Sequence, residues 1–587
     1  MITLSSEVIS EVLRAKITDA LSALGFLIQD YGVEVVVSGR PDLADYQWNG
    51  ALALAKQLQK SPQEIAVQVV EFLQKDTDFS EVSSAGPGFV NLRLSESVVM
   101  RAAEQLAESD RLLAPLAQKK KKIAVDYGGP NVAKPLHVGH MRSAVIGNSL
   151  IRLMQLLGHE VLGDVHQGDW GTQMGMVIIG IQREQPDLPY FDELFAGEYP
   201  TESPVTLEDL GRIYPFESGL AKTDPEAKAA ALKATLELQQ GRRGYLALWG
   251  QFAKISLADA KRQYERLGII FDYWHGESYY NDMIPGIVKD LLDRRIAKQD
   301  NGATIIPVGE DSPPLILLKS DGAYLYATTD IATIVDRTKN GFDESHYVVD
   351  KRQGLHFEQV FDAGRQAGYV PEDQVLTFHG FGTLNGEDGK PFKSRDGGVM
   401  RLEELIDTLL AAAKETMQRA GVAKDYSEEE QQEIAEKVAV AALKFGDLSS
   451  DKKSDYKFDP ARFASFEGKT GPSILYTIVR LRAVLRKAGV AGAWVGSNLA
   501  ESERALLLVL LATPKVLAEV AVTLTPHTVA DHLFSVAQAA NRFYEQCRIM
   551  QAAGDEQVRW IAVTELTERV LVQLANGVLG MPVPSRM

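Results

Sequence analysis

One segment near residue 130 restricts the fold of this chain more than any other. Residues 123–127 form a short apolar run that is typical of a buried strand, and a glycine-containing turn follows at 128–131. A helical pattern begins at His137, and a second strand is predicted at 160–165. Strand, glycine-bearing turn, helix and strand is the opening of a parallel α/β nucleotide-binding fold. We therefore expect a Rossmann-like domain that begins here.

The rest of the chain is long enough for about three or four domains, because it has 587 residues. Residues 1–115 alternate helix and strand patterns, which predicts an N-terminal α+β domain. The Rossmann-like domain is expected at 116–455, with a helix-rich insertion at about 187–265, and a helical bundle at 456–587. The fold class is thus α/β multidomain. Further strand patterns within the central domain lie at 302–308, 315–319 and 346–350.

Composition excludes several classes of protein. With 62 Lys and Arg against 79 Asp and Glu, the net charge is −17, whereas a general nucleic-acid coat or a membrane-surface protein needs a basic face. A single cysteine, Cys547, excludes an intramolecular disulfide and a cysteine-rich zinc site. The N-terminus lacks a signal-peptide pattern, and the most apolar stretch, 505–514, is about half a membrane span and predicts a core helix. We expect a cytoplasmic protein without a membrane partner.

Two histidines, His137 and His140, stand where the turn passes into the helix. Backbone N–H groups at a helix N-terminus attract phosphate, and the two imidazoles could donate further hydrogen bonds to it. Gly139 lies between them and would let a base or ribose approach the backbone. A helix cap or a surface pair is the more common explanation of this spacing. A zinc site is rejected, since no Cys-x-x-Cys or His-Glu-x-x-His accompanies the pair.

The longer segment Pro130-Asn-Val-Ala-Lys-Pro-Leu-His-Val-Gly-His140 resembles the HIGH signature of class I aminoacyl-tRNA synthetases. Its extended form, with Asn131 and Lys134 ahead of the histidines, is similar to that of the arginyl-tRNA synthetase family. Further blocks that resemble this family occur in order along essentially the whole chain, and they begin at Asp45, Ala85, Gly168, Asp321, Leu443, Asp455, Phe466 and Asn541.

This resemblance implies an arginine–tRNA ligase. The arginine carboxylate would be joined to the AMP part of ATP, pyrophosphate would leave, and the arginyl group would pass to the 3′ end of tRNA(Arg). Such a reaction depends on positioning and on cationic stabilisation of phosphate charge. ATP with Mg²⁺ is expected as the substrate complex, without a tightly bound metal. The residues implied for catalysis and ATP binding are Lys134, His137, Gly139, His140, Gly168, Asp169, Trp170, Gly171 and Lys393.

An arginine substrate needs acceptors for the five donors of its guanidinium group. Tyr326 and Asp330 are four residues apart, so they would share one face of a helix. Taken alone, Asp330 is more readily explained as a helix N-cap. The arginine pocket that the resemblance implies consists of Asp126, Asn131, Tyr326, Asp330 and Gln353.

The second class I signature, Lys-Met-Ser-Lys-Ser, is altered. In the loop Gly389-Lys-Pro-Phe-Lys-Ser-Arg-Asp-Gly-Gly398, Pro391 and Ser394 stand where the two lysines are expected. By resemblance Lys134 substitutes for the second lysine. Three cations remain in the loop, and the sequence does not decide which of them contacts pyrophosphate: Lys390, Lys393 or Arg395.

Contact with tRNA is predicted from charge and from resemblance. Residues 444–487 contain ten Lys and Arg against five acidic residues, a net +5, which suits either phosphate contact or an ordinary solvated helix face. The chain is expected to be a monomer. Its rival functions are a different class I synthetase and a catalytically silent relative that only binds tRNA. The residues predicted to lie near tRNA are Tyr46, Gln47 and Asn49 at the elbow, Tyr456 in the basic segment and Tyr544 at the anticodon.

Overall fold

The computed structural model divides into two compact units, which are treated separately below. One contains Met1–Leu116, Val422–Lys437 and Ser465–Met587, and the other contains Ala117–Gly421 and Val438–Ala464. The structure describes residues 9–26, 33–40, 42–309, 312–320, 322, 324–386, 389–390 and 400–587.

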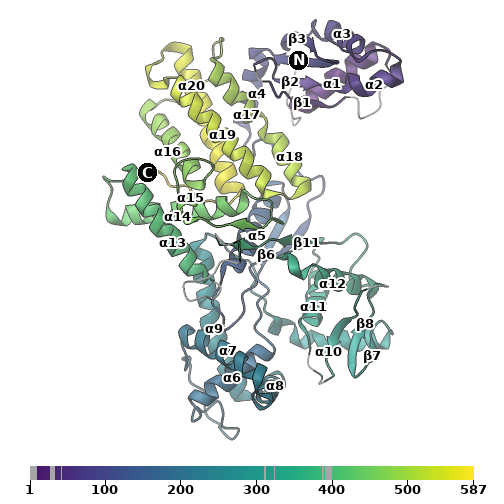
Figure 1. Cartoon of the computed structure of the whole chain (residues 1–587), viewed down its shortest axis with the longest axis vertical. Coiled ribbons are helices and arrows are strands. Elements are labelled where there is room, and N and C mark those ends of the chain that lie inside the picture. The colour runs from purple at the N-terminus through teal and green to yellow at the C-terminus, as the bar shows by residue number, and fades with distance from the viewer. Residues whose placement is uncertain are drawn as a thin grey trace. The chain divides into compact units, whose positions relative to one another are not determined.

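The second unit holds the residues predicted for catalysis and is named the catalytic unit for that reason. It contains a four-stranded parallel sheet (Figure 1). Its strand order is β11-β10-β5-β6, and helix α5 (Val138–Leu156) connects β5 to β6. This arrangement confirms the Rossmann-like domain. The strands are β5 (Lys122–Asp126), β6 (Glu160–Asp164), β10 (Glu344–Asp350) and β11 (Val375–Phe381).

Helix α5 lies deep in the catalytic unit. Most of its side chains are buried, so it has no polar face and does not show the pattern of a surface helix. Close approach to the sheet requires Gly147, because a Cβ there would lie 2.4 Å from Cγ of Tyr127. The glycine therefore brings the helix onto the end of β5.

A helical insertion follows β6. Two of its four helices have side-chain N-caps: Thr206 and Asp209 form a capping box at the start of α7, and Asp224 accepts hydrogen bonds at the start of α8. The helix-rich pattern predicted at 187–265 lies in this insertion, which also includes the earlier helix α6. The helices are α6 (Thr172–Glu184), α7 (Leu207–Thr223), α8 (Pro225–Gln239) and α9 (Arg243–Arg266).

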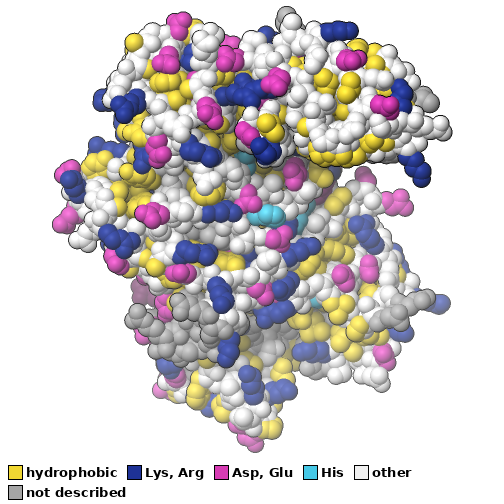
Figure 2. All heavy atoms as spheres, turned by 45° about the horizontal axis from the view of Figure 1, so that its top comes forward, with side chains coloured by type: hydrophobic (Ala, Val, Ile, Leu, Met, Phe, Trp, Pro, Cys, Tyr) yellow, Lys and Arg dark blue, Asp and Glu magenta, His cyan; other side chains and the backbone are white. Residues whose placement is uncertain are grey.

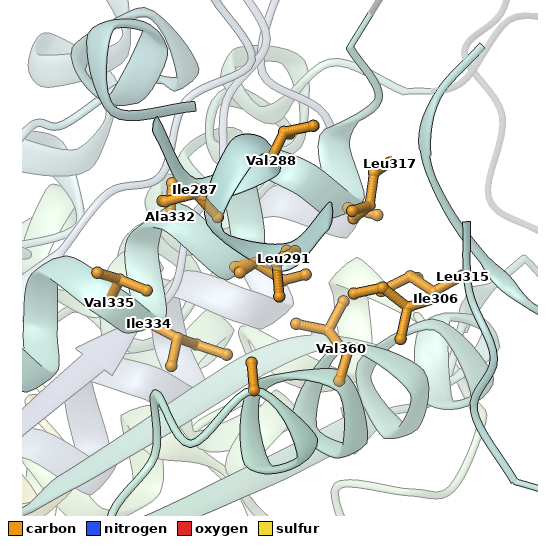
Figure 3. Packing of buried hydrophobic residues seen from close by; sticks show 14 of the residues in the cluster. Ile287, Val288, Leu291, Ile306, Leu315, Leu317, Ala332, Ile334, Val335 and Val360 are labelled. Atoms are coloured by element: carbon orange, nitrogen blue, oxygen red, sulfur yellow. The ribbon is translucent and has the colours of Figure 1, made fainter. Parts of the chain in front are cut away.

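A second, antiparallel sheet precedes β10. It consists of β7 (Lys298–Asp300), β8 (Ala303–Ile306) and β9 (Leu315–Leu318), in that order. Together with α10 (Ile284–Asp293), α11 (Tyr326–Lys339) and α12 (Gly354–Gln366) it encloses an apolar cluster. Figure 3 shows aliphatic side chains of the strands and of all three helices pointing toward one another. This packing fixes α11, which carries two of the predicted arginine-binding residues.

The last part of the catalytic unit returns to α5. Strand β12 (Leu384–Asn385) pairs with β13 (Tyr456–Lys457), and α15 (Pro460–Phe463) follows. Arg142 of α5 is 1% exposed, and its Nε donates to Oδ1 of Asp447 at 2.7 Å. Removal of either charge would leave the other buried without its partner, which typically costs about 3–5 kcal/mol. The unit ends at Ala464, so the boundary expected after residue 455 falls inside it. Helices α13 (Leu402–Ala420) and α14 (Glu428–Leu448) precede β13.

The N-terminal part of the first unit is an antiparallel sheet with helices, as expected for an α+β domain. Its strand order is β1-β2-β4-β3. Ser61 and Glu64 form a capping box at α3. The strands are β1 (Val35–Val37), β2 (Tyr46–Trp48), β3 (Phe79–Ala85) and β4 (Phe89–Leu94), and the helices are α1 (Ile9–Ala23), α2 (Gly50–Leu58), α3 (Pro62–Leu73) and α4 (Glu96–Glu108).

The C-terminal part of the first unit is helical. Glu501–Thr523 is long and apolar enough to cross a membrane by composition alone, but it divides at Ala512 into α17 and α18. Leu506, Leu507 and Leu510 are fully buried, which confirms the core helix predicted at 505–514. The principal helices are α16 (Gly471–Ala488), α17 (Glu501–Leu511), α18 (Thr513–Thr523), α19 (Pro526–Gln546) and α20 (Gly554–Val572).

Candidate functional site

The two histidines cap helix α5 with one nitrogen each. Gly139 N donates to Nδ1 of His137 at 3.1 Å, and His137 N donates to Nδ1 of His140 at 3.0 Å. The two rings stack with their centroids 3.8 Å apart. The helix-cap explanation of the pair is therefore correct for the Nδ1 atoms. Within the part of the chain that the structure describes, no residue is hydrogen-bonded to either Nε2.

Both imidazoles are neutral donors at neutral pH. Burial and the charge of Lys134 lower the pKa of His137, while burial and the charges of His137 and Lys134 lower the pKa of His140 well below its ordinary value. A neutral imidazole whose Nδ1 accepts a hydrogen bond carries its proton on Nε2. The resemblance implied that His137, His140 and Lys134 all supply positive charge to the phosphates, and this must be corrected: the histidines offer N–H groups, whereas Lys134 offers charge.

Gly139 makes room for the neighbouring histidine. A Cβ at this position would lie 3.0 Å from Cε1 of His137, closer than side chains normally approach. The sequence suggested room for a base or ribose, but the space next to this glycine is taken by the imidazole of the chain itself.

The turn after β5 and the loop after β6 are joined by backbone hydrogen bonds. Gly168 N donates to Pro130 O at 2.9 Å, and Val132 N donates to Gly168 O at 3.0 Å. A Cβ on Gly168 would lie 2.4 Å from Oδ1 of Asn131, so glycine is required here. Two segments that the sequence predicted for ATP and for arginine thus form one surface at the carboxyl edge of the sheet. Gly171, with φ 98°, begins α6 next to open space.

Asp169 and Trp170 are held by internal contacts. Asp169 accepts hydrogen bonds from Ser278 N at 2.9 Å and from Ser278 Oγ at 2.6 Å, and burial raises its pKa. Trp170 Nε1 donates to Oδ1 of Asn281 at 3.2 Å, and its ring meets Trp249 edge to face. These two residues fix the 278–281 segment against the loop after β6.

A buried ion cluster underlies the carboxyl edge of β5 and β6. Asp126 and Asp164 are neighbours on the two strands, and Nη2 of Arg337 from α11 lies 2.8 Å from a carboxylate oxygen of each. Asp126 was predicted to bind arginine, but one of its oxygens is already paired with this internal guanidinium. His166 lies close enough that Asp126 and Asp330 raise its pKa against the effect of burial.

Further acidic groups lie at the same edge. Oδ2 of Asp330 lies 2.6 Å from Nε2 of His356, whose ring is 5.0 Å from that of Tyr326. Both predicted residues therefore face the same histidine. Asp330 lies inside α11, where Leu325 is the N-cap residue, so the helix-cap alternative for this aspartate is wrong. Tyr326 is 61% exposed and open to a ligand.

Glu277 is a candidate that the sequence analysis missed. It begins the 3₁₀ segment Glu277–Met283, and burial raises its pKa to about 7, with the charges of Asp169 and Asp330 contributing and His166 opposing. Its backbone N donates to Gln167 O at 3.0 Å. No spacing in the sequence links it to the site. The only local signal is Gly276 before it, where a Cβ would lie 2.3 Å from Asp169.

Two predicted positions are exposed or undescribed. Gln353 ends the 3₁₀ segment Lys351–Gln353 after β10, and its side chain is exposed at the carboxyl edge. Lys393 lies outside the described residues, as do Pro391, Ser394 and Arg395. Among the described positions, no group of three or more His, Cys, Asp and Glu side chains could hold a metal ion.

The predicted elbow residues lie in and after β2. Tyr46 is 5% exposed and packs in the core of the N-terminal sheet, so its ring is not available to a partner, contrary to the expectation. Gln47 Nε2 donates to Oδ1 of Asn91 at 2.9 Å. Asn49 is the N-cap residue of α2, although its side chain makes no capping hydrogen bond.

Several side chains of the basic segment 444–487 are buried or contact other groups of the protein. Tyr456 donates its hydroxyl to Oδ1 of Asp447 at 2.8 Å, and the guanidinium group of Arg142 lies over its ring, so its hydroxyl is engaged inside the protein and its contact with tRNA stays a prediction. Lys444 is fully buried, which lowers its pKa to about 7. Figure 2 shows Lys and Arg side chains interspersed with Asp and Glu on the visible face.

A cavity of about 300 Å³ between α16 and α19 is lined by Tyr476 and Arg480, and Tyr544 of α19 lies next to that arginine. The guanidinium of Arg480 lies between two tyrosine rings, 4.7 Å from that of Tyr476 and 5.0 Å from that of Tyr544. Tyr544 is 38% exposed. Aromatic faces with an arginine between them are suited to unstacked bases.

The fold and the site together define a class I aminoacyl-tRNA synthetase: a parallel sheet, a histidine-capped helix after its first strand and neutral imidazole donors at its carboxyl edge. Three family models match the chain. They are described as tRNA synthetases class I (R), catalytic domain, at residues 102–460, as arginyl tRNA synthetase N terminal domain at 11–94, and as DALR anticodon binding domain at 474–587.

Similar proteins agree with these matches. Arginine–tRNA ligases of Alkaliphilus oremlandii and of Maricaulis maris are each 43% identical to the chain, and each comparison covers 99% of this chain and 100% of the relative. The arginyl-tRNA synthetase structure of Plasmodium falciparum matches with a TM-score of 0.80 at 23% identity, over 100% of both chains. The arginyl-tRNA synthetase structure of Thermus thermophilus matches with a TM-score of 0.75 at 22% identity, over 98% of this chain and 100% of that chain. The chain belongs to the arginyl-tRNA synthetase family.

Proposed function

We propose that the carboxyl edge of the catalytic sheet is where this chain performs the reaction of its family, the ATP-dependent attachment of L-arginine to tRNA(Arg). In the first step an arginine carboxylate oxygen bonds to the α-phosphorus of ATP, the bond to the β-phosphate oxygen breaks, and pyrophosphate leaves with its charge. In the second step a hydroxyl of the tRNA 3′ end bonds to the arginyl carbonyl carbon, AMP leaves, and the hydroxyl proton passes to solvent.

The observation that carries this proposal is the group of acidic side chains at the carboxyl edge of the sheet, the edge at which the histidine-capped helix α5 begins. Asp330 and Glu277 offer carboxylates at the carboxyl edge of the sheet, and burial strengthens their attraction for a guanidinium. Binding of a cation would favour the ionised form of Glu277, whose pKa is raised to about 7 in the free protein. The guanidinium group of arginine, with its five donors, would be bound by such carboxylates.

ATP is proposed to lie over the N-terminus of α5. The Nε2–H groups of His137 and His140 would donate to its phosphates, and Lys134 would supply charge to them. Gly168 and Gly171 keep the neighbouring backbone free of side chains. Mg²⁺ is expected to reach the site on the substrate phosphates.

The tRNA is proposed to be bound through the first unit, with unstacked anticodon bases against Tyr476, Arg480 and Tyr544. Gln47 and Asn49 remain the candidates for the elbow, because Tyr46 is buried. We expect the enzyme to be a monomer and to act in the cytoplasm. Sedimentation of the purified chain would check the monomeric state.

Replacement of Asp330 by Asn tests the pocket. It removes one charge from a charge-assisted pair worth about 1.5–3 kcal/mol, so the KM for arginine should rise roughly ten- to a hundredfold while the KM for ATP stays nearly constant. Arginylation of transcribed tRNA(Arg) is the assay. Asp336→Asn, on the same helix, is the matched control.

A rise in the KM for ATP alone would contradict the pocket assignment. If the unaltered protein binds tRNA(Arg) but neither activates nor transfers arginine, it is a silent relative that only binds tRNA.

A further inference from the structure

The loop that carries Lys134 packs into the core of the helical insertion. Val132 and Ala133, which precede it, belong to the same buried cluster as Ile213 of α7 and Phe252 of α9. The loop therefore has its apolar side chains in the insertion, although it connects a strand and a helix of the Rossmann-like domain.

Two directed contacts hold this loop. Ala133 N donates to Oγ of Ser256 on α9 at 3.2 Å, and Ala133 has a φ of 63°, a backbone conformation that residues with a side chain rarely adopt. Nζ of Lys134 lies 4.5 Å from the ring centroid of Tyr214 on α7. A strained backbone persists only where its surroundings hold it, and here the surroundings are the insertion.

We propose that Tyr214 is a positioning residue for the adenylation step, and that the helical insertion uses its ring to set where the charge of Lys134 stands. This rests on the proposed role of Lys134 at the ATP phosphates. Tyr214 is half-buried against the insertion core, so its ring has a defined place. A cation over the face of an aromatic ring is attracted electrostatically.

The choice of an aromatic partner has a chemical reason. Lys134 lines a cavity of about 300 Å³ together with Glu208, Asp259 and Glu403, any of which would neutralise an ammonium group. Arg262 already lies 2.7 Å from Asp259 and 3.3 Å from Glu403. A neutral ring orients the ammonium without cancelling its charge, so the charge remains available to phosphate. Without the ring, the flexible lysine could turn toward a carboxylate of the same cavity.

Tyr214→Leu should lower kcat for arginylation about two- to thirtyfold, which corresponds to the cation–π range of about 0.5–2 kcal/mol. Tyr214→Phe keeps the ring face and should restore most of the rate. The KM for arginine should not change in either variant. Phe216→Leu is the matched control, because Phe216 lies on the same helix and is 61% exposed.

A double-mutant cycle that combines Tyr214→Leu with Lys134→Met tests this proposal separately from the proposed function. If Tyr214 acts through the lysine, Tyr214→Leu should cause no further loss of kcat in the Lys134→Met background. An equal loss in both backgrounds would overturn the proposal, as would a Phe variant as slow as the Leu variant with an unchanged melting temperature. An undiminished kcat in Lys134→Met alone would instead refute the role of Lys134 itself.

Discussion

Two pairs of stacked histidines lie in the catalytic unit, and they differ in what their nitrogens touch. His137 and His140 accept backbone hydrogen bonds with Nδ1 and leave Nε2 for a substrate. His346 and His379, on β10 and β11, stack with their centroids 5.1 Å apart, and Nδ1 of the former lies 2.8 Å from Nε2 of the latter.

The remaining nitrogens of the second pair are also occupied. Nε2 of His346 lies 3.1 Å from a carboxylate oxygen of Glu344, and Nδ1 of His379 lies 3.0 Å from Nζ of Lys452. Each ring nitrogen of His346 and His379 therefore has a hydrogen-bond partner within the protein. The two pairs share ring stacking and burial, and among the described residues only the first pair has ring nitrogens without a protein partner, which makes it the candidate for ligand binding.

The largest effect is expected from His140→Ala. The variant removes a donor aimed at charge that develops in the transition state, which typically costs about 2.7–4 kcal/mol, so the rate of ATP–pyrophosphate exchange should fall roughly a hundred- to a thousandfold. Arginine affinity, measured by equilibrium dialysis, should change little. Exchange at the unaltered rate would leave this pair with a capping role only.

His379→Ala should act on stability and not on chemistry. Its loss leaves Nδ1 of buried His346 and Nζ of Lys452 without this partner, at a cost of about 1–3 kcal/mol in the free energy of unfolding. Urea unfolding measures the cost, and exchange per folded molecule should stay within a few-fold. A thousandfold loss of exchange in a folded variant would erase the distinction between the two pairs.

The pH dependence of stability sharpens the same comparison. Burial, together with the charge of Lys452, lowers the pKa of His379 to about 2, whereas the ordinary value is 6.5. Between these values the unfolded chain binds a proton that the folded chain does not, so stability falls as the pH drops below about 6.5, by at most about 1.4 kcal/mol per pH unit. Urea unfolding of the unaltered protein at about pH 5 and about pH 7 measures this slope.

The matched variant is His379→Gln, which cannot titrate in this range and should show a shallower slope. An identical slope in the two proteins would place the effect at other histidines, of which His140 and His532 also have lowered pKa values.

The smallest effect is expected from Gly139→Ala. Its Cβ would press on the imidazole of His137, and a side chain about 30° away from its rotamer costs about 0.5–1.5 kcal/mol, so exchange should slow about two- to tenfold. The melting temperature should not decrease, because alanine has a higher helix propensity than glycine. A destabilised variant with unchanged exchange would contradict this account.

Local patterns in the sequence predicted the elements that depend on local chemistry. The strand at 123–127, the helix from His137 and the core helix at 505–514 were found from apolar runs, turn glycines and helix formers. The resemblance added the two histidines and Asp330 as site residues. The N-cap role that Asp330 suggested when taken alone was wrong. These features involve residues near one another in the chain.

Contacts between distant segments were not predictable. The sequence around Tyr46 indicates an exposed aromatic residue, whereas in the structure its strand pairs with β4 and its ring is buried. Tyr456 was assigned to tRNA because nothing in the sequence pairs its hydroxyl with Asp447. Glu277 is brought to the site only because its segment runs beside β6. Residue identity alone carries no information on which acceptor a distant donor will meet.

The buried pair of Arg142 and Asp447 has a consequence for synthesis of the chain on the ribosome. The two residues are 305 positions apart, and at about 5–20 residues per second the arginine emerges about 15–60 s before its counter-ion. Until then α5 cannot bury this side chain without leaving its charge unpaired. We expect nascent chains that stop short of Asp447 to be cleaved by protease within α5, and chains that expose it beyond the ribosome to be protected.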